Sequence, residues 1–150
     1  MTPGLSIAQA FYLYDRRVCM YKVLGYISIA LVVLLTSPYW LRKINSWTVK
    51  TKNKRFLNVI KFLRKLHKPL GIVLGIIALW HGYLALGALR LHTGVLTYAG
   101  FILTIGLGYL FYKKKDKRFF KAHKALALIS ILLLIIHFLW PSALWSLFKI

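Results

Sequence analysis

"LHKPLGIVLGIIALWH" (Leu66–His81) is an apolar stretch of sequence with a histidine close to each end. A second stretch, "AHKALALISILLLIIH" (Ala122–His137), has the same frame, because each copy contains a His-Lys pair and a second histidine fourteen residues after the first. Four of the five histidines in the chain lie in this duplicated pattern. Fourteen residues make about 21 Å of helix and nearly four turns, so both histidines of a copy lie on one helix face.

The composition around these stretches is that of a membrane protein. Of 150 residues, 59% are hydrophobic, and the mean hydropathy is +0.66, which is too apolar for a soluble domain of this size. Four uncharged spans have close to the ~20 residues that a helix needs to cross a bilayer, namely 23–41, 69–89, 91–112 and 125–148. We therefore predict an all-α integral membrane four-helix bundle that forms a single domain over residues 1–150.

The net charge of +20 is concentrated in alternate connections between the spans. Ten Lys and Arg residues lie in 42–68 and seven in 113–124. By the positive-inside rule we predict a multi-pass protein of the cytoplasmic membrane, with these two connections in the cytoplasm and both termini outside. The expected partner of the basic connections is the anionic lipid bilayer rather than nucleic acid.

The segment Arg55–Leu66 within the first basic connection has apolar residues on one helical face and Lys on the other. This pattern predicts a short amphipathic interfacial helix before the second span. A docking surface for a soluble partner is the alternative interpretation.

The predicted orientation makes two levels of histidine. The second and fourth spans both run outward, so His67 and His123 lie together at the inner edge, and His81 and His137 lie together nearer the outside. Ionisable groups inside a membrane are costly and usually functional. Two pairs at matched depth therefore predict a cofactor held between two helices.

The residues available in the spans exclude several kinds of cofactor. The only carboxylate side chains, Asp15 and Asp116, lie outside the spans, which excludes carboxylate-bridged metal sites and acid–base pairs of carboxylates there. Two histidines would leave a zinc ion two ligands short. Haem iron needs only two axial ligands, so two imidazoles at each level predict two haems b, with His67 and His123 on the inner haem and His81 and His137 on the outer.

Further residues are assigned to the haem surroundings. Gly71 and Gly75 lie on roughly the same face as His67 and would leave room for a flat macrocycle, whereas the glycines of 91–112 are interpreted as helix packing. Lys68 and Lys124 each follow an inner histidine and would bind the propionates of the inner haem.

Arg90 and His92 lie in the turn just outside the level of His81. The simpler interpretation is that Arg90 anchors the chain at the membrane interface and that His92 is a solvated turn residue. We hypothesise that together they attract an anionic outer acceptor.

"LHKPLG" followed by "LWHG", with a second histidine pair two spans later, resembles the ferric reductase-like transmembrane family, and the bacterial four-helix b-type cytochromes are similar in plan. The resemblance covers about residues 55–140. It implies that the four paired histidines are axial ligands of two haems b, and that electrons pass from a cytoplasmic donor to an outer acceptor.

Three departures from the family limit this resemblance. Its larger members have six spans and a fused flavin and NADPH domain, and they often have Arg where this chain has Lys68. We therefore expect a transmembrane oxidoreductase component without its own flavin or NAD(P)H domain, reduced by a separate reductase or a quinol. The alternatives are a quinone-linked cytochrome b subunit of a larger dehydrogenase complex and a haem-free, histidine-rich membrane protein that handles metal.

Overall fold

The computed structural model describes residues 6–86, 92–143 and 146. Its elements in chain order are α1 (Ile7–Ile44), a π-helical turn η1 (Asn45–Val49), α2 (Lys54–Leu86), α3 (Thr93–Lys114) and α4 (Lys117–Leu139). The predicted all-α class and the four long helices are confirmed. All four helices are long and apolar enough to cross a membrane.

The helix ends follow from local sequence. Ser6 and Gln9 form a capping box at the start of α1, and the Asp116 carboxylate accepts the Arg118 N–H at the start of α4. Lys115 has a left-handed backbone (φ 56°) that ends α3, so a connection of only two residues reverses the chain.

The amphipathic segment Arg55–Leu66 forms the first turns of α2 rather than a separate helix. Pro69, which opens the predicted second span, is accommodated inside the same helix. Ile60 on the apolar face of the segment is only 4% exposed, because this part of α2 packs on the end of α1. The segment therefore extends the α1–α2 hairpin beyond the predicted span.

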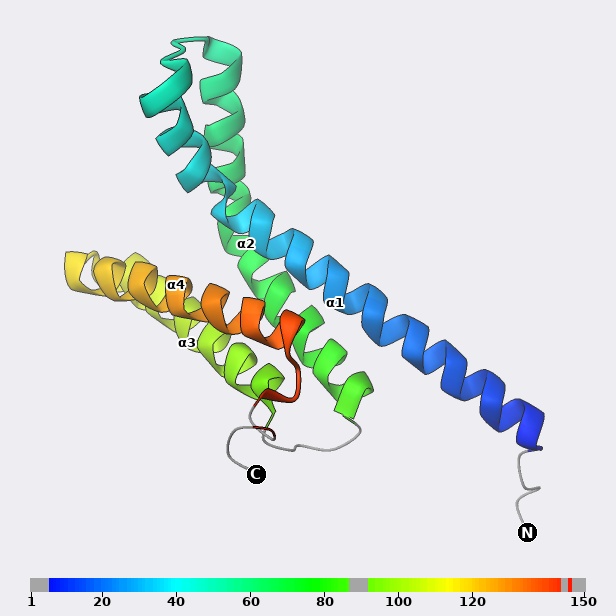
Figure 1. Cartoon of the computed structure of the whole chain (residues 1–150). Helices are drawn as coiled ribbons and strands as arrows, with labels where there is room; N and C mark the ends of the chain where they lie inside the picture. The colour runs from blue at the N-terminus through cyan, green and yellow to red at the C-terminus, as the bar shows by residue number, and fades with distance from the viewer. Residues whose placement is uncertain (1–5, 87–91, 144–145, 147–150) are drawn as a thin grey trace.

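Two helical hairpins make up the bundle. α1 packs along α2 and α3 along α4, and a smaller contact joins α2 to α3. Figure 1 shows the tips of both hairpins at the end of the molecule away from the start of α1 and the end of α4. The two basic connections thus share one end, as the predicted topology requires.

Most large apolar side chains outside the small core are exposed on the helix surfaces, for example Ile72, Ile76, Leu103 and Leu132. Apolar surface of this extent is not stable in water. Such a surface is compatible with lipid, in which helices satisfy their own backbone groups.

Candidate cofactor site

The structure brings the four patterned histidines together as two pairs. The ring centroids of His67 and His123 are 6.2 Å apart, and those of His81 and His137 are 6.4 Å apart. Each pair has one ring from α2 and one from α4, which are not a closely packed pair of helices. The pairing expected from the sequence is therefore found, with the rings bridging the space between the two helices.

The inner pair is oriented by backbone carbonyl groups of the two other helices. Nδ1 of His67 lies 3.0 Å from the Leu35 carbonyl oxygen of α1, and Nδ1 of His123 lies 2.8 Å from the Thr104 carbonyl oxygen of α3. A carbonyl oxygen only accepts, so both ring nitrogens donate.

The outer pair is oriented by one carbonyl and one hydroxyl. Nδ1 of His81 lies 2.7 Å from the Tyr21 carbonyl oxygen. Nδ1 of His137 lies 2.9 Å from Oγ1 of Thr93, which is itself 2.7 Å from the Pro141 carbonyl oxygen. Because the Thr93 hydroxyl donates its one proton to that carbonyl, it accepts the hydrogen bond from His137.

All four imidazoles therefore carry a proton on Nδ1. In the neutral ring the lone pair then lies on Nε2, which is the usual arrangement of a metal-binding histidine held by an outer hydrogen bond. The four hydrogen bonds fix both the protonated nitrogen and the direction of each ring before any ligand binds.

The spacing within each pair fits one metal ion between two rings. An imidazole nitrogen lies about 1.1 Å from its ring centroid, given ring bonds of about 1.33 Å, and a metal–imidazole bond measures about 2.0–2.1 Å. Two imidazoles on opposite sides of one ion therefore have centroids about 6.3 Å apart. The observed separations of 6.2 and 6.4 Å lie on either side of this value.

Glycines on neighbouring helices give three of the rings their space. A Cβ at Gly25 would lie 3.0 Å from Cε1 of His81, one at Gly94 would lie 3.0 Å from Cε1 of His137, and one at Gly108 would lie 3.2 Å from the His123 ring. Contacts this short are tighter than nine in ten of those that real Cβ atoms make. Even an alanine at any of the three positions would require the ring to shift by a few tenths of an ångström.

Two of these glycines stand in the same relation to the carbonyl that the histidine reaches. Gly25 is four residues after Tyr21, and Gly108 is four residues after Thr104. In a helix the residue at i+4 donates to the carbonyl at i and lies beside it. The absent side chain thus lets the ring approach an oxygen that is already in a helical hydrogen bond.

Near the Leu35 carbonyl the helix contains a proline rather than a glycine. Pro38 lacks an N–H and clashes with the turn before it, which loosens the helix at this level. The Leu34 carbonyl, which loses its partner, accepts from the Ser37 hydroxyl at 2.6 Å. The neighbouring Leu35 carbonyl accepts from His67.

A layer of small and apolar side chains separates the two levels. Leu74, midway between His67 and His81, is 3% exposed and packs with Val32 and Phe101. Ser130, midway between His123 and His137, is fully buried. A Cβ at Gly100 would lie 2.6 Å from its Oγ, so α3 and α4 approach closely here.

The other residues assigned to the haem surroundings lie as follows. A Cβ at Gly71 would have nothing within 4 Å, whereas one at Gly75 would lie 3.4 Å from Ile105 of α3. The Lys68 ammonium lies 3.4 Å from the centroid of the Tyr112 ring, and the Lys124 ammonium lies 5.1 Å from that of Phe120. The proposed contacts of these four residues with haem stay predictions.

Of the two residues assigned to an outer acceptor, His92 is the N-cap residue of α3 and its side chain makes no capping hydrogen bond. Arg90 lies outside the described residues. Their hypothesised role is therefore not tested by the geometry.

Sequence reasoning missed the residues that hold the rings. Gly94 and Gly108 were interpreted as helix packing, which fits Gly100 but not these two. One signal was available for Gly25, which is the only glycine in the first span. No sequence pattern distinguishes Thr93 from the other threonines of α3.

In the described part of the chain no three His, Cys, Asp or Glu side chains come together as a metal site. Each level offers two nitrogen ligands, so the ion that it suits is one whose remaining ligands come from elsewhere, as in haem. Comparisons with protein-family models, curated proteins and solved structures found no match to this chain.

Proposed function

We propose that this chain is a membrane-embedded b-type cytochrome with two bis-histidine haems, which carries electrons across the bilayer from a cytoplasmic donor to an outer acceptor. The observation that carries the proposal is the repeated imidazole pair. Both pairs have the spacing of two axial ligands. All four rings have Nδ1 occupied by a hydrogen bond, and no described residue makes a hydrogen bond to their Nε2.

Haem iron, when bound, alternates between the ferric and ferrous states and so takes up and releases single electrons. The residues of this chain would hold it at two depths, about 21 Å apart along α2 and α4. The two histidines of each level would supply both protein ligands of a bound haem, which favours electron transfer over oxygen binding. The apolar layer around Leu74 would keep water and ions from passing between the levels.

The proposal includes the direction of electron flow and a separate donor. The basic connections suggest a cytoplasmic side for the hairpin tips, where a reductase or a quinol would deliver electrons. The proposal also includes an outer electron acceptor and, where a quinol is the donor, a quinone site.

The reduced-minus-oxidised visible spectrum of the purified full chain, with the haem-to-protein ratio, tests this function. We expect two haems per chain with low-spin b-type bands, and one haem after His123→Leu or His137→Leu. Replacing His92, the histidine outside the pattern, should leave both haems in place and serves as the control. A colourless, redox-inactive protein that binds a divalent metal through the same histidines would contradict the proposal and favour the metal-handling alternative.

A further inference from the structure

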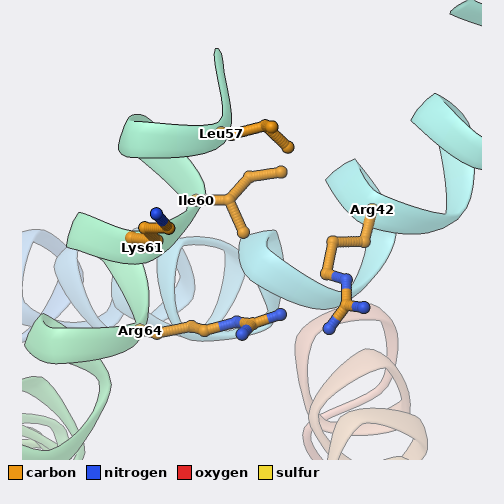
Figure 2. Close-up of a pocket in the computed structure, with 5 residues that line it drawn as sticks. All are labelled: Arg42, Leu57, Ile60, Lys61 and Arg64. Atoms are coloured by element: carbon orange, nitrogen blue, oxygen red, sulfur yellow. The ribbon is translucent and has the colours of Figure 1, made fainter. Parts of the chain in front are cut away.

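A basic pocket lies where the start of α2 packs on the end of α1, on the side of the inner histidine pair that faces the hairpin tip. Arg42, Leu57, Ile60, Lys61 and Arg64 line it, and it has a volume of about 210 Å³. Figure 2 shows the side chains of Arg42 and Arg64 extending toward the same space from the two helices, below Ile60. Three of the five lining residues are cations and none is a carboxylate.

Among the residues that the structure describes, no carboxylate side chain pairs with the cations of this pocket. The chain has only two carboxylate side chains. Asp15 lies 27 residues before Arg42 on α1, or about 40 Å away along the helix. Asp116 caps α4 in the other hairpin. Three cations brought together without a carboxylate repel one another, so an anion between them would stabilise the pocket.

The depth of the pocket places it at the expected membrane surface. Arg42 directly follows the predicted first span, and the exposed aromatics Tyr39 and Trp40 lie three and two residues before it. Exposed Tyr and Trp beside Arg are typical of the interface between hydrocarbon and headgroups. Arg64 lies one turn before His67, so the pocket is also next to the inner histidine level.

The lining and its position select the kind of anion. Two guanidinium groups match the oxygens of a phosphate, which they bind with paired hydrogen bonds. Leu57, which is 41% exposed, lies beside them on the side of the hairpin tip. On the other side of Arg64 the apolar predicted span begins, so an acyl chain joined to the phosphate would lie along it, whereas free phosphate would use only the cations.

We infer that this pocket is a binding site for one anionic phospholipid of the inner leaflet, whose headgroup phosphate lies between Arg42 and Arg64. Basic pockets between membrane helices on the cytoplasmic side are a known way to bind such headgroups. The lipid would bridge α1 and α2 at the level where the hairpin leaves the membrane. This inference is independent of the proposed haem function, because it uses none of the four paired histidines.

The test is native mass spectrometry of the full chain in detergent, titrated with phosphatidylglycerol and, in parallel, with phosphatidylcholine. We expect one tightly held phosphatidylglycerol and much weaker retention of phosphatidylcholine. The variant Arg42→Gln/Arg64→Gln should bind phosphatidylglycerol at least about tenfold more weakly, since charge-assisted hydrogen bonds are lost. The matched control Lys52→Gln/Lys54→Gln removes the same charge from the same connection outside the pocket and should stay within about twofold of the native chain.

Two further arms separate the alternatives. Arg42→Lys/Arg64→Lys keeps the charge but loses the paired hydrogen bonds, so its affinity should fall between those of the native chain and the Gln variant. This Lys variant also replaces the Gln variant as the test if circular dichroism shows that the Gln variant does not fold. Excess inorganic phosphate should not displace the lipid. Displacement by phosphate alone, equal binding of both lipids, or an equal loss in the Lys52/Lys54 control would overturn the inference.

Discussion

The inner and outer histidine pairs have almost the same spacing but are held by different kinds of group. Both inner rings donate to backbone carbonyls, of Leu35 and Thr104. At the outer level His81 also donates to a carbonyl, but His137 donates to the Thr93 hydroxyl. The inner level is thus built from main-chain acceptors alone, and the outer level depends on one side chain.

This difference shows which parts of each level a substitution can reach. A backbone carbonyl cannot be removed by mutation, so the orientation of the inner rings can be disturbed by filling the space around them or by changing the helix at Pro38, but not by removing an acceptor side chain. The outer level can also be changed by altering a single hydrogen-bond acceptor. The two levels therefore predict different responses to the same types of substitution.

The largest difference between the two levels should come from a substitution that fills the space left by a glycine beside one histidine ring. Gly108→Val should displace His123 and remove the proposed inner haem, and Gly25→Val should displace His81 and remove the outer one. Overpacking of this kind costs about 1–3 kcal/mol. Haem content and the reduced spectrum of each purified variant measure the effect.

Gly106→Val is the matched control for this pair, because a Cβ at Gly106 would have nothing within 4 Å. It should retain both haems. If Gly108→Val and Gly106→Val lose haem equally, the loss is a general effect of valine in α3, and the space beside Gly108 has no separate role.

A smaller effect that is shared by both levels is expected from the layer between them. Gly100→Ala would place a methyl group 2.6 Å from Oγ of Ser130 and push α3 from α4 midway between the pairs. We expect a loss of about 1–3 kcal/mol in stability, seen as a lower thermal midpoint, with both haems affected alike.

The double variant Gly100→Ala/Ser130→Ala tests the cause, because it removes the Oγ and leaves Cβ of residue 130 as the nearest atom, at 3.4 Å. It should recover much of the lost stability. A double variant that is no more stable than Gly100→Ala would show that the Ser130 contact is not the source of the loss.

The sequence was sufficient for the features that depend on periodicity and charge. The fourteen-residue spacing placed the four histidines on two helices, and the structure pairs them as expected. Span length and apolar composition predicted the four helices. These features are local to one helix or follow from the direction in which each helix runs.

What the sequence could not supply is the contact between helices. That Gly25 lies against His81 depends on how α1 packs on α2, over a separation of 56 residues, and no residue pattern encodes that register. The same holds for Thr93 and His137. The sequence also placed a boundary at Lys68, because charge marks the end of an apolar span, whereas α2 continues through Lys68 and Pro69.

The smallest effect, and the one most specific to the outer level, is expected from Thr93. The Thr93 hydroxyl accepts from Nδ1 of His137 and donates to the Pro141 carbonyl, so it holds the ring in place. It would also increase the electron density on Nε2 and so favour the ferric state of the proposed outer haem. Thr93→Val keeps the shape but removes the acceptor, so the potential of the outer haem should rise by roughly 20–60 mV, equivalent to one hydrogen bond. The potential of the inner haem should not change, since both inner rings keep their carbonyl partners. Thr93→Ser retains the hydroxyl and should leave both potentials near the native values. A redox titration that follows the two haems separately measures these shifts, and equal shifts at both levels, or the same shift in the Ser variant, would show that the hydroxyl does not control the outer site.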